Sequence, residues 1–277
     1  SIWRRRSASR RAVIMLLQPS AADHRGGDRA LGGARARADF GRRADPLLRF
    51  LAAEAAVGRA DAARALWSID GVAATVSGAT LDALARRADV RVIIADGKLR
   101  LEPPAATLRL GSDAMAAEEA MQWDLRQIKV DMARRLLGVD GRGVTVAVVD
   151  SGVDYHHPLL RASYRGAQPD GSVRHARNWW CNRGLDSFCG QGDTYPVDSV
   201  GHGTHVLGTI VAPAGIGVAP GARWIAARAC QADGCPLSWM VAALEWIVDL
   251  GEDRPDIVNL SLGTAVPLEI NLYQQAV

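Results

Sequence analysis

Long apolar runs are missing from this sequence of 277 residues. A membrane-spanning helix needs about 18 or more consecutive apolar residues, and no segment approaches that length. The apolar stretch nearest the amino terminus, residues 12–17, is also too short for the core of a signal peptide. The sequence therefore predicts no membrane span, and no secretion signal is visible in it.

An excess of charge of one sign is also missing. Lysine and arginine together number 33 and the acidic residues 30, so the net charge of +3 gives no reason to expect a nucleic-acid partner. Arginines gather before residue 44, but no aromatic side chains interleave with them from 25 to 37, which favours a solvated tract. A hydrophobic content of 48% is typical of a globular protein, and the length allows one large or two moderate domains.

Cysteine is scarce, with Cys181, Cys189, Cys230 and Cys235 the only four. They allow three pairings, of which two local ones, 181 with 189 and 230 with 235, are the simplest. Such disulfides would fit an oxidising compartment. A zinc site is an alternative, although neither spacing is the usual two-residue knuckle, and buried free thiols are another.

Two of the six histidines stand in the motif Gly-His-Gly-Thr-His-Val-Leu-Gly-Thr at 201–209. The glycines on either side of His202 leave room for a close approach, and the apolar residues that follow predict a buried helix. A histidine at the mouth of a helix suits a general base. Taken alone, the motif fits a core histidine in a tight turn equally well.

Two further segments read as buried strands. Residues 144–149 are all apolar or β-branched, which is typical of a parallel sheet, and the strand ends on Asp150. A carboxylate at that end of a strand lies where open α/β sheets place their sites. Residues 256–263 predict a second such strand, and the alternation with a helix over 237–250 indicates a parallel sheet.

Asp-Ser-Gly at 150–152, the histidine motif and Asn-x-Ser-Leu-Gly at 259–263, in this order, resemble the subtilisin-like serine proteases. The resemblance runs from about residue 123 to the last residue and implies a parallel-sheet α/β domain that hydrolyses peptide bonds. It makes His202 the general base, Asp150 the group that orients its imidazole, and His205 a structural residue. The order Asp, His, Ser is that of subtilisin.

The amino-terminal part predicts a small α+β domain of the ferredoxin-like type. Its expected order is β-α-β-β-α-β. The strands are expected at 11–17, 66–69, 72–76 and 90–95, the helices at 46–66 and 81–87, and a two-residue Asp-Gly hairpin turn at 70–71.

In front of a subtilisin-like domain, this part resembles the inhibitor-type (I9) propeptide of that family. The resemblance implies a propeptide domain over 1–105, a linker over 106–120 and the peptidase domain over 121–277. It also implies that the tail at about 95–106 lies in the active-site cleft as a substrate-like strand until it is cut. The partners expected are thus a protein or peptide substrate and the chain's own propeptide.

The same resemblance assigns the substrate cleft. Ser261, Leu262 and Gly263 match the strand that pairs with the substrate backbone and walls the first specificity pocket. Gly234, in the segment 233–236, matches the opposite edge, and side-chain pockets between such edges set preference. Pro236 removes one amide donor from that edge, and an ordinary turn is the alternative for this segment.

The sequence also departs from the family. Asp150 and His202 are 52 positions apart, and the inserted residues, with Cys181 and Cys189, resemble the bacillopeptidase F branch. The family's serine follows a Gly-Thr pair, but none of the Gly-Thr pairs at 203–204, 208–209 and 263–264 is followed by serine. We therefore expect a fragment that stops before the nucleophile and is inactive by itself. The rival readings are an inactive peptide-binding homologue, and a propeptide that acts as inhibitor or folding chaperone.

No cofactor is expected. Where the family usually has an aspartate ligand for a stabilising Ca²⁺, this sequence has Leu159. A hard cation needs oxygen ligands, so that site is not carried over, while Ca²⁺ elsewhere is left open. The resemblance and the cysteines together imply a secreted protein.

Overall fold

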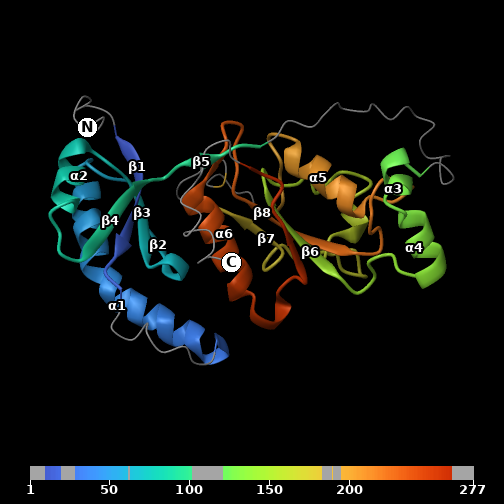
Figure 1. Cartoon of the computed structure of the whole chain (residues 1–277), viewed down its shortest axis with the longest axis horizontal. Coiled ribbons are helices and arrows are strands. Elements are labelled where there is room, and N and C mark those ends of the chain that lie inside the picture. Colours follow the sequence, from blue (N-terminus) through green and yellow to red (C-terminus); the bar gives the residue numbers. More distant parts are fainter. Residues whose placement is uncertain are drawn as a thin grey trace. The chain divides into compact units, whose positions relative to one another are not determined.

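The computed structural model describes residues 10–19, 29–61, 63–101, 121–182, 189 and 195–263, with the side chains of 29–34 left out. Contacts divide the chain into two compact units (Figure 1). Among the described residues, one unit holds those up to Gly97 with Pro236–Glu245, and the other holds Lys98–Cys235 and the residues from Trp246 onward. The linker predicted at 106–120 lies outside the described residues.

The first unit is built on a four-stranded antiparallel sheet. Its strands are β1 (Arg11–Leu17), β2 (Arg64–Leu66), β3 (Gly71–Val76) and β4 (Val90–Ala95), in the order β2-β3-β1-β4. The helices are α1 (Arg29–Ala56) and α2 (Gly78–Leu84). The elements thus follow one another in the predicted order β-α-β-β-α-β. Strand β1 is one of the two central strands, and its residues Val13 to Leu17 are all buried.

Helix α1 corrects the prediction of a helix from Pro46 to Leu66. It begins at Arg29 and ends at Ala56, so Pro46 lies inside it rather than at its first turn. A proline inside a helix removes one backbone hydrogen bond. The buried side chains Phe40, Ala44, Leu47 and Leu51 lie on both sides of Pro46 at helical spacing. Pro46 itself is exposed. The burial of these four apolar side chains offsets the lost hydrogen bond.

The predicted hairpin is also wrong in detail. Residues Trp67–Ile69 form a 3-10 helix instead of a strand, and Asp70 adopts a left-handed backbone conformation with φ 50°. The amide of Ser68 donates to Glu245 Oε1 at 2.7 Å instead of to a strand partner. The strand therefore ends at Leu66, three residues earlier than predicted.

The second unit contains the predicted parallel sheet. Its strands are β6 (Thr145–Asp150), β7 (Trp179–Cys181), β8 (Arg223–Arg228) and β10 (Ile257–Asn259), in the order β10-β6-β8-β7. Its longer helices are α4 (Val130–Leu137) and α5 (His202–Val211). Helix α6 (Leu237–Asp249) is divided, with the residues up to Glu245 in the first unit and those from Trp246 in the second. Shorter elements are α3 (Trp123–Gln127), β5 (Lys98–Leu99), β9 (Cys235–Pro236) and the 3-10 turns Arg161–Ser163 and Gly251–Asp253. No described helix is long and apolar enough to cross a membrane.

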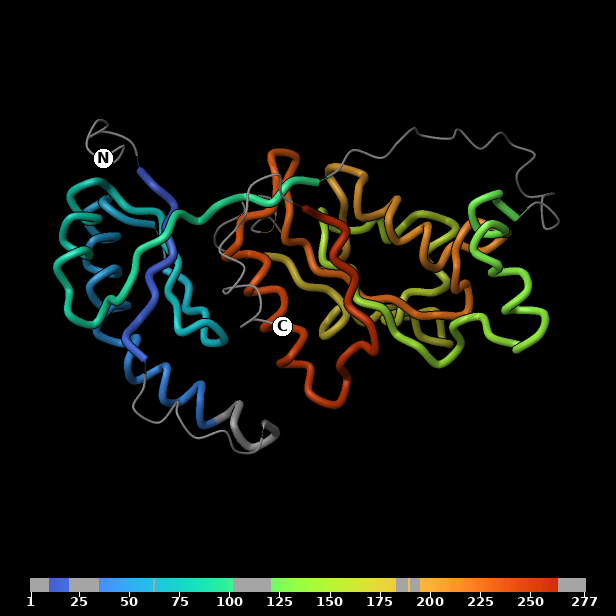
Figure 2. Tube along the Cα trace, viewed as in Figure 1, coloured from blue at the N-terminus to red at the C-terminus, as the bar shows by residue number. Residues whose placement is uncertain are grey.

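Strand β6 lies inside the sheet, between β10 and β8, and every residue from Val146 to Asp150 is buried. Figure 2 colours the same trace by residue number, so that β6 and α5 can be located on it. Strand β10, by contrast, was predicted to be buried, yet Ile257 and Val258 are 53% and 37% exposed. It is an edge strand of the described sheet, paired with β6 on one side, and so it lacks the cover that buries β6.

Candidate active site

Asp150 is the last residue of β6 and is fully buried. Its carbonyl oxygen accepts hydrogen bonds from the amides of Ala229 at 2.9 Å and Cys230 at 3.1 Å, which fixes the end of the strand against the end of β8. The chain then turns sharply at Gly152, whose φ is 102°. A Cβ atom there would lie 1.9 Å from the carbonyl oxygen of Val197, so only glycine fits this turn.

His202 is the first residue of α5 and follows Gly201, which has a φ of 88°. The next residue, Gly203, explains how the helix comes so close to the strand. A Cβ atom on Gly203 would lie 2.1 Å from the carbonyl oxygen of Gly152 and 3.1 Å from Asp150 Cβ. The sequence indicated that these glycines admit a close neighbour, and that neighbour is the end of β6.

Asp150 and His202 are brought together as predicted. The Nδ1 atom of His202 lies 2.8 Å from Asp150 Oδ1 and 2.9 Å from Oδ2. The amide of Ser151 donates a further hydrogen bond to Asp150 Oδ1 at 2.6 Å. His202 is 6% exposed, so the pair is nearly sealed from water.

The electrostatics of the pair follow from this burial. Removal from water raises the pKa of the Asp150 carboxyl above its ordinary value, while the hydrogen bonds from the Ser151 amide and from His202 act in the opposite direction. A carboxylate against Nδ1 favours the tautomer that carries its proton there. The other ring nitrogen, Nε2, is then the one able to take a proton from a reacting group.

Sequence reasoning missed Asp198. Its half-buried carboxylate accepts hydrogen bonds from the Ser151 hydroxyl at 2.9 Å and from the Thr204 amide at 2.9 Å. It thus links the residue after Asp150 to the first turn of α5. An Asp-Ser pair shortly before a helix is a capping signal, and that signal could have found it.

The predicted substrate-binding residues lie on both sides of the segment 98–101. Arg100 and Gly263 exchange two backbone hydrogen bonds, from Arg100 N to Gly263 O at 2.8 Å and from Gly263 N to Arg100 O at 3.1 Å. On the other side, β5 pairs with β9, and a Cβ on Gly234 would lie 2.6 Å from the carbonyl oxygen of Leu99. Lys98 also forms an ion pair with Asp233.

The remaining two residues of that prediction lie just before Gly263. Ser261 Oγ accepts a hydrogen bond from Asn259 Nδ2 at 3.0 Å, and Leu262 is half-buried. That Ser261, Leu262, Gly263 and Gly234 bind substrate stays a prediction.

Both local disulfides are present, Cys181 with Cys189 and Cys230 with Cys235. The simplest pairing is therefore confirmed, in place of a zinc site or free thiols. The second disulfide joins Cys230, two residues after β8, to strand β9, and the amide of Cys230 donates to the carbonyl oxygen of Asp150.

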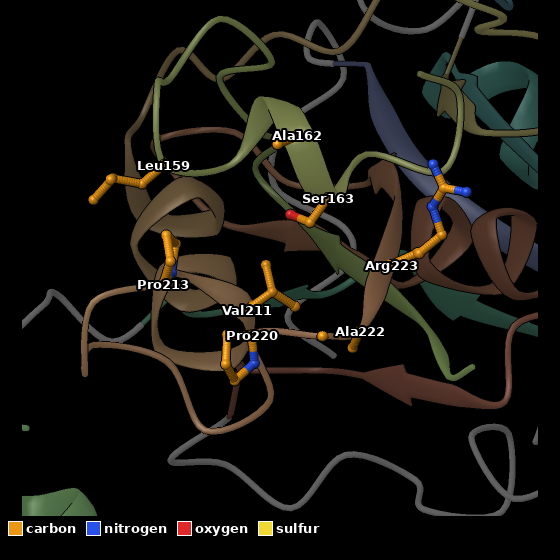
Figure 3. A pocket seen from close by; sticks show the side chains of 9 residues that line it. Leu159, Ala162, Ser163, Val211, Pro213, Pro220, Ala222 and Arg223 are labelled. Atoms are coloured by element: carbon orange, nitrogen blue, oxygen red, sulfur yellow. The ribbon is translucent and has the colours of Figure 1, made fainter. Parts of the chain in front are cut away.

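Leu159 lines a pocket of about 350 Å³, shown in Figure 3, together with the polar side chains of Ser163 and Arg223. Val211, Pro213, Pro220 and Ala222 also line it, and no carboxylate is among the lining residues. The polar hydroxyl of Ser163 already donates to the carbonyl of Leu160 at 3.0 Å.

Comparison with known proteins shows where the chain has relatives. Residues 141–277 match the subtilase family, peptidase S8. The chain is 31% identical to bacillopeptidase F of Bacillus subtilis (strain 168) over 234 residues, which are 78% of this chain and 16% of that protein. It is 31% identical to subtilisin E of the same organism over 172 residues, 60% of this chain and 39% of that protein. The chain thus spans well under half the length of these curated relatives.

A crystal structure of the epidermin leader peptide processing serine protease (EpiP) from Staphylococcus aureus is similar to this one. The TM-score is 0.54 and the sequence identity 17%, over 97% of this chain and 56% of that one. At this identity the likeness concerns the fold alone.

Proposed function

Residues 141–277 belong to the subtilase family, and from this premise we propose that the chain is the propeptide and the amino-terminal catalytic segment of a serine endopeptidase of the bacillopeptidase F branch. The observation that carries the proposal is the buried hydrogen bond between Asp150 and His202. A histidine held by a buried carboxylate at the end of a parallel strand is the acid–base half of a catalytic triad.

The reaction we propose is acyl transfer to a serine that this sequence does not contain. The serine hydroxyl attacks the peptide carbonyl, and Nε2 of His202 takes its proton. Asp150 holds the Nδ1 proton and stabilises the imidazolium. His202 then gives the proton to the leaving amine, and a second round with water frees the acyl group.

Within these 277 residues no serine follows a Gly-Thr pair, so we propose that the chain by itself does not hydrolyse peptides. In subtilisin, loss of the nucleophile lowers kcat about 10⁶-fold. The pair of Asp150 and His202 would act once a downstream segment supplies the serine.

We further propose that residues up to 105 form an I9-type propeptide whose tail lies in the cleft like a substrate. Three observations support it. The sheet order β2-β3-β1-β4 is that of a ferredoxin-like fold. Similarity to bacillopeptidase F covers more of the chain than residues 141–277 alone. The segment 98–101 pairs through its backbone on both sides, as extended peptides bind to strand edges.

Under this proposal, the contacts of residues 98–101 also indicate what kind of backbone the cleft accepts. Leu99 is 3% exposed, and Arg100 and Gly263 pair through main-chain atoms. Protein or peptide substrates would bind the same way, by main-chain hydrogen bonds with one apolar side chain enclosed. The two disulfides favour an oxidising location outside the cell.

A fluorophosphonate, which reacts with activated serines, tests the proposal. We expect the polypeptide continued past residue 277 to be labelled on one serine beyond that position, and the 277-residue chain to stay unlabelled. We also expect His202→Ala to abolish the labelling. A folded, continued polypeptide that reacts with no fluorophosphonate would identify an inactive peptide-binding homologue instead.

A further inference from the structure

The carboxylate of Asp198 accepts five hydrogen bonds. Oδ1 receives the Ser151 hydroxyl at 2.9 Å, the Val200 amide at 3.0 Å and the Gly201 amide at 2.8 Å. Oδ2 receives the amide of Thr204 at 2.9 Å and its hydroxyl at 2.6 Å. This one side chain therefore binds both the turn after β6 and the start of α5.

Ser151 passes the contact on to both members of the catalytic pair. Its hydroxyl donates to Asp198 and accepts from the amide of Gly203 at 3.0 Å. Its own amide donates to Asp150 Oδ1. A shift of Ser151 would therefore disturb the carboxylate of Asp150 and the backbone next to His202 together.

Thr204 provides a second connection. Its hydroxyl donates to Asp198 and accepts from the amide of Asp154 at 2.9 Å. The first turn of α5 is thereby tied to the chain on the far side of the Gly152 turn. The N-cap residue before His202 is Gly201, which offers no side chain as a cap. The carboxylate of Asp198, three residues earlier than Gly201, instead accepts from free amides at the positive end of the helix.

We propose that Asp198 is a positioning residue for the pair of Asp150 and His202. It contacts no reacting atom and acts through Ser151 and the first turn of α5. Its charge-assisted hydrogen bonds to the turn after β6 and to the start of α5 fix the distance between His202 Nδ1 and the Asp150 carboxylate. The inference rests on the proposed function only in assigning acid–base chemistry to that pair.

The test measures the hydrogen bond of the pair directly, in the 277-residue chain. The Nδ1 proton of His202, followed by NMR, should exchange with water at least tenfold faster in Asp198→Asn than in the unsubstituted chain, with folding checked by circular dichroism. Asp170→Asn is the matched control, because Asp170 accepts the amide and the hydroxyl of Ser172 in an exposed turn. We expect no change there. An equal exchange rate in folded Asp198→Asn would overturn the proposal.

If Asp198→Asn does not fold, Ser151→Ala replaces it. This change removes the hydroxyl relay without altering any charge, and the same tenfold acceleration is expected. An unchanged rate would refute the relay. The exchange rate does not depend on peptide hydrolysis, so a failed labelling of the downstream serine leaves this result readable by itself.

Discussion

The Nδ1 atom of His202 lies within 2.9 Å of both carboxylate oxygens of Asp150, although 52 positions separate the two residues. The contact exists because β6 ends on Asp150 and α5 begins on His202, and because Gly152 and Gly203 let the two ends touch. The environment of each side chain is therefore formed by residues that are distant from it in the sequence. The pair exists only in the folded chain, so measurements on it also test the fold.

Burial of Asp150 should make the wild-type chain less stable at neutral pH than an uncharged variant. Its pKa is raised above 3.8, so the folded state holds the proton more tightly than the unfolded state. The contribution of Asp150 to stability therefore falls as pH rises from 3.8 through the raised pKa. We expect Asp150→Asn to add about 1 kcal/mol to the unfolding free energy at pH 7 and nothing at pH 3. Urea unfolding at both pH values measures this.

Asp170→Asn controls for the loss of any carboxylate. Hydrogen bonds from Ser172 lower the pKa of Asp170, so its contribution is present above the ordinary pKa of 3.8 and is lost as pH falls through the lowered value. This variant should lose stability at pH 7. A gain of equal size for Asp150→Asn at pH 3 and pH 7 would show that burial does not act on its charge.

Gly234 should be required for the pairing of β5 with β9. A methyl group there would lie 2.6 Å from the carbonyl oxygen of Leu99, and its φ of 121° is strained for any other residue. We expect Gly234→Ala to increase deuterium uptake by residues 98–101 about tenfold or more. Hydrogen exchange with mass spectrometry measures it.

Gly171→Ala separates backbone strain from the steric clash. Gly171 also has a positive φ, 82°, but nothing lies within 4 Å of the added methyl. It should leave the protection of residues 98–101 as it is. Equal protection in Gly234→Ala and the unsubstituted chain would mean that β5 does not depend on this edge.

The disulfide between Cys230 and Cys235 should stabilise the second unit. Both residues are fully buried, and the bond closes a short loop. Replacing both by alanine should lower the unfolding free energy by about 2 kcal/mol, as the loop-entropy estimate gives. Guanidinium unfolding without reductant measures the change. A double variant as stable as the parent would show that the loop is held by its other contacts.

Much of the site could be predicted from the sequence. Asp150 and His202 lie at the ends of a strand and a helix with strong apolar patterns. The local sequence therefore predicted both elements and the position of each residue in them. Asp198 was missed. The Asp-Ser pair before α5 signals a helix cap, but the hydrogen bonds of Asp198 with Ser151 and Thr204 exist only in the folded loop. Local pattern identifies the groups that do chemistry better than the groups that hold them.

The errors in the fold have the same origin. Pro46 is a strong local signal for a helix start, but the apolar stripe from Phe40 to Leu51 extends past it and decides the helix. The sequence around Ile257 and Val258 predicted a buried strand because both residues are apolar. Their exposure, however, depends on the neighbouring strands, and the described sheet has a neighbour on one side only. In both cases tertiary packing overrode a local preference.

The central claim is that His202 is the general base of a serine endopeptidase. The direct measurement is kcat for a peptide substrate in the polypeptide continued past residue 277, with His202→Ala compared with His205→Ala. His205 lies one turn on in α5 with an exposed side chain, so its variant serves as the control. We predict a loss of about 10⁶-fold for His202→Ala, as in subtilisin, and less than tenfold for His205→Ala. Equal activities in the two variants would contradict the account.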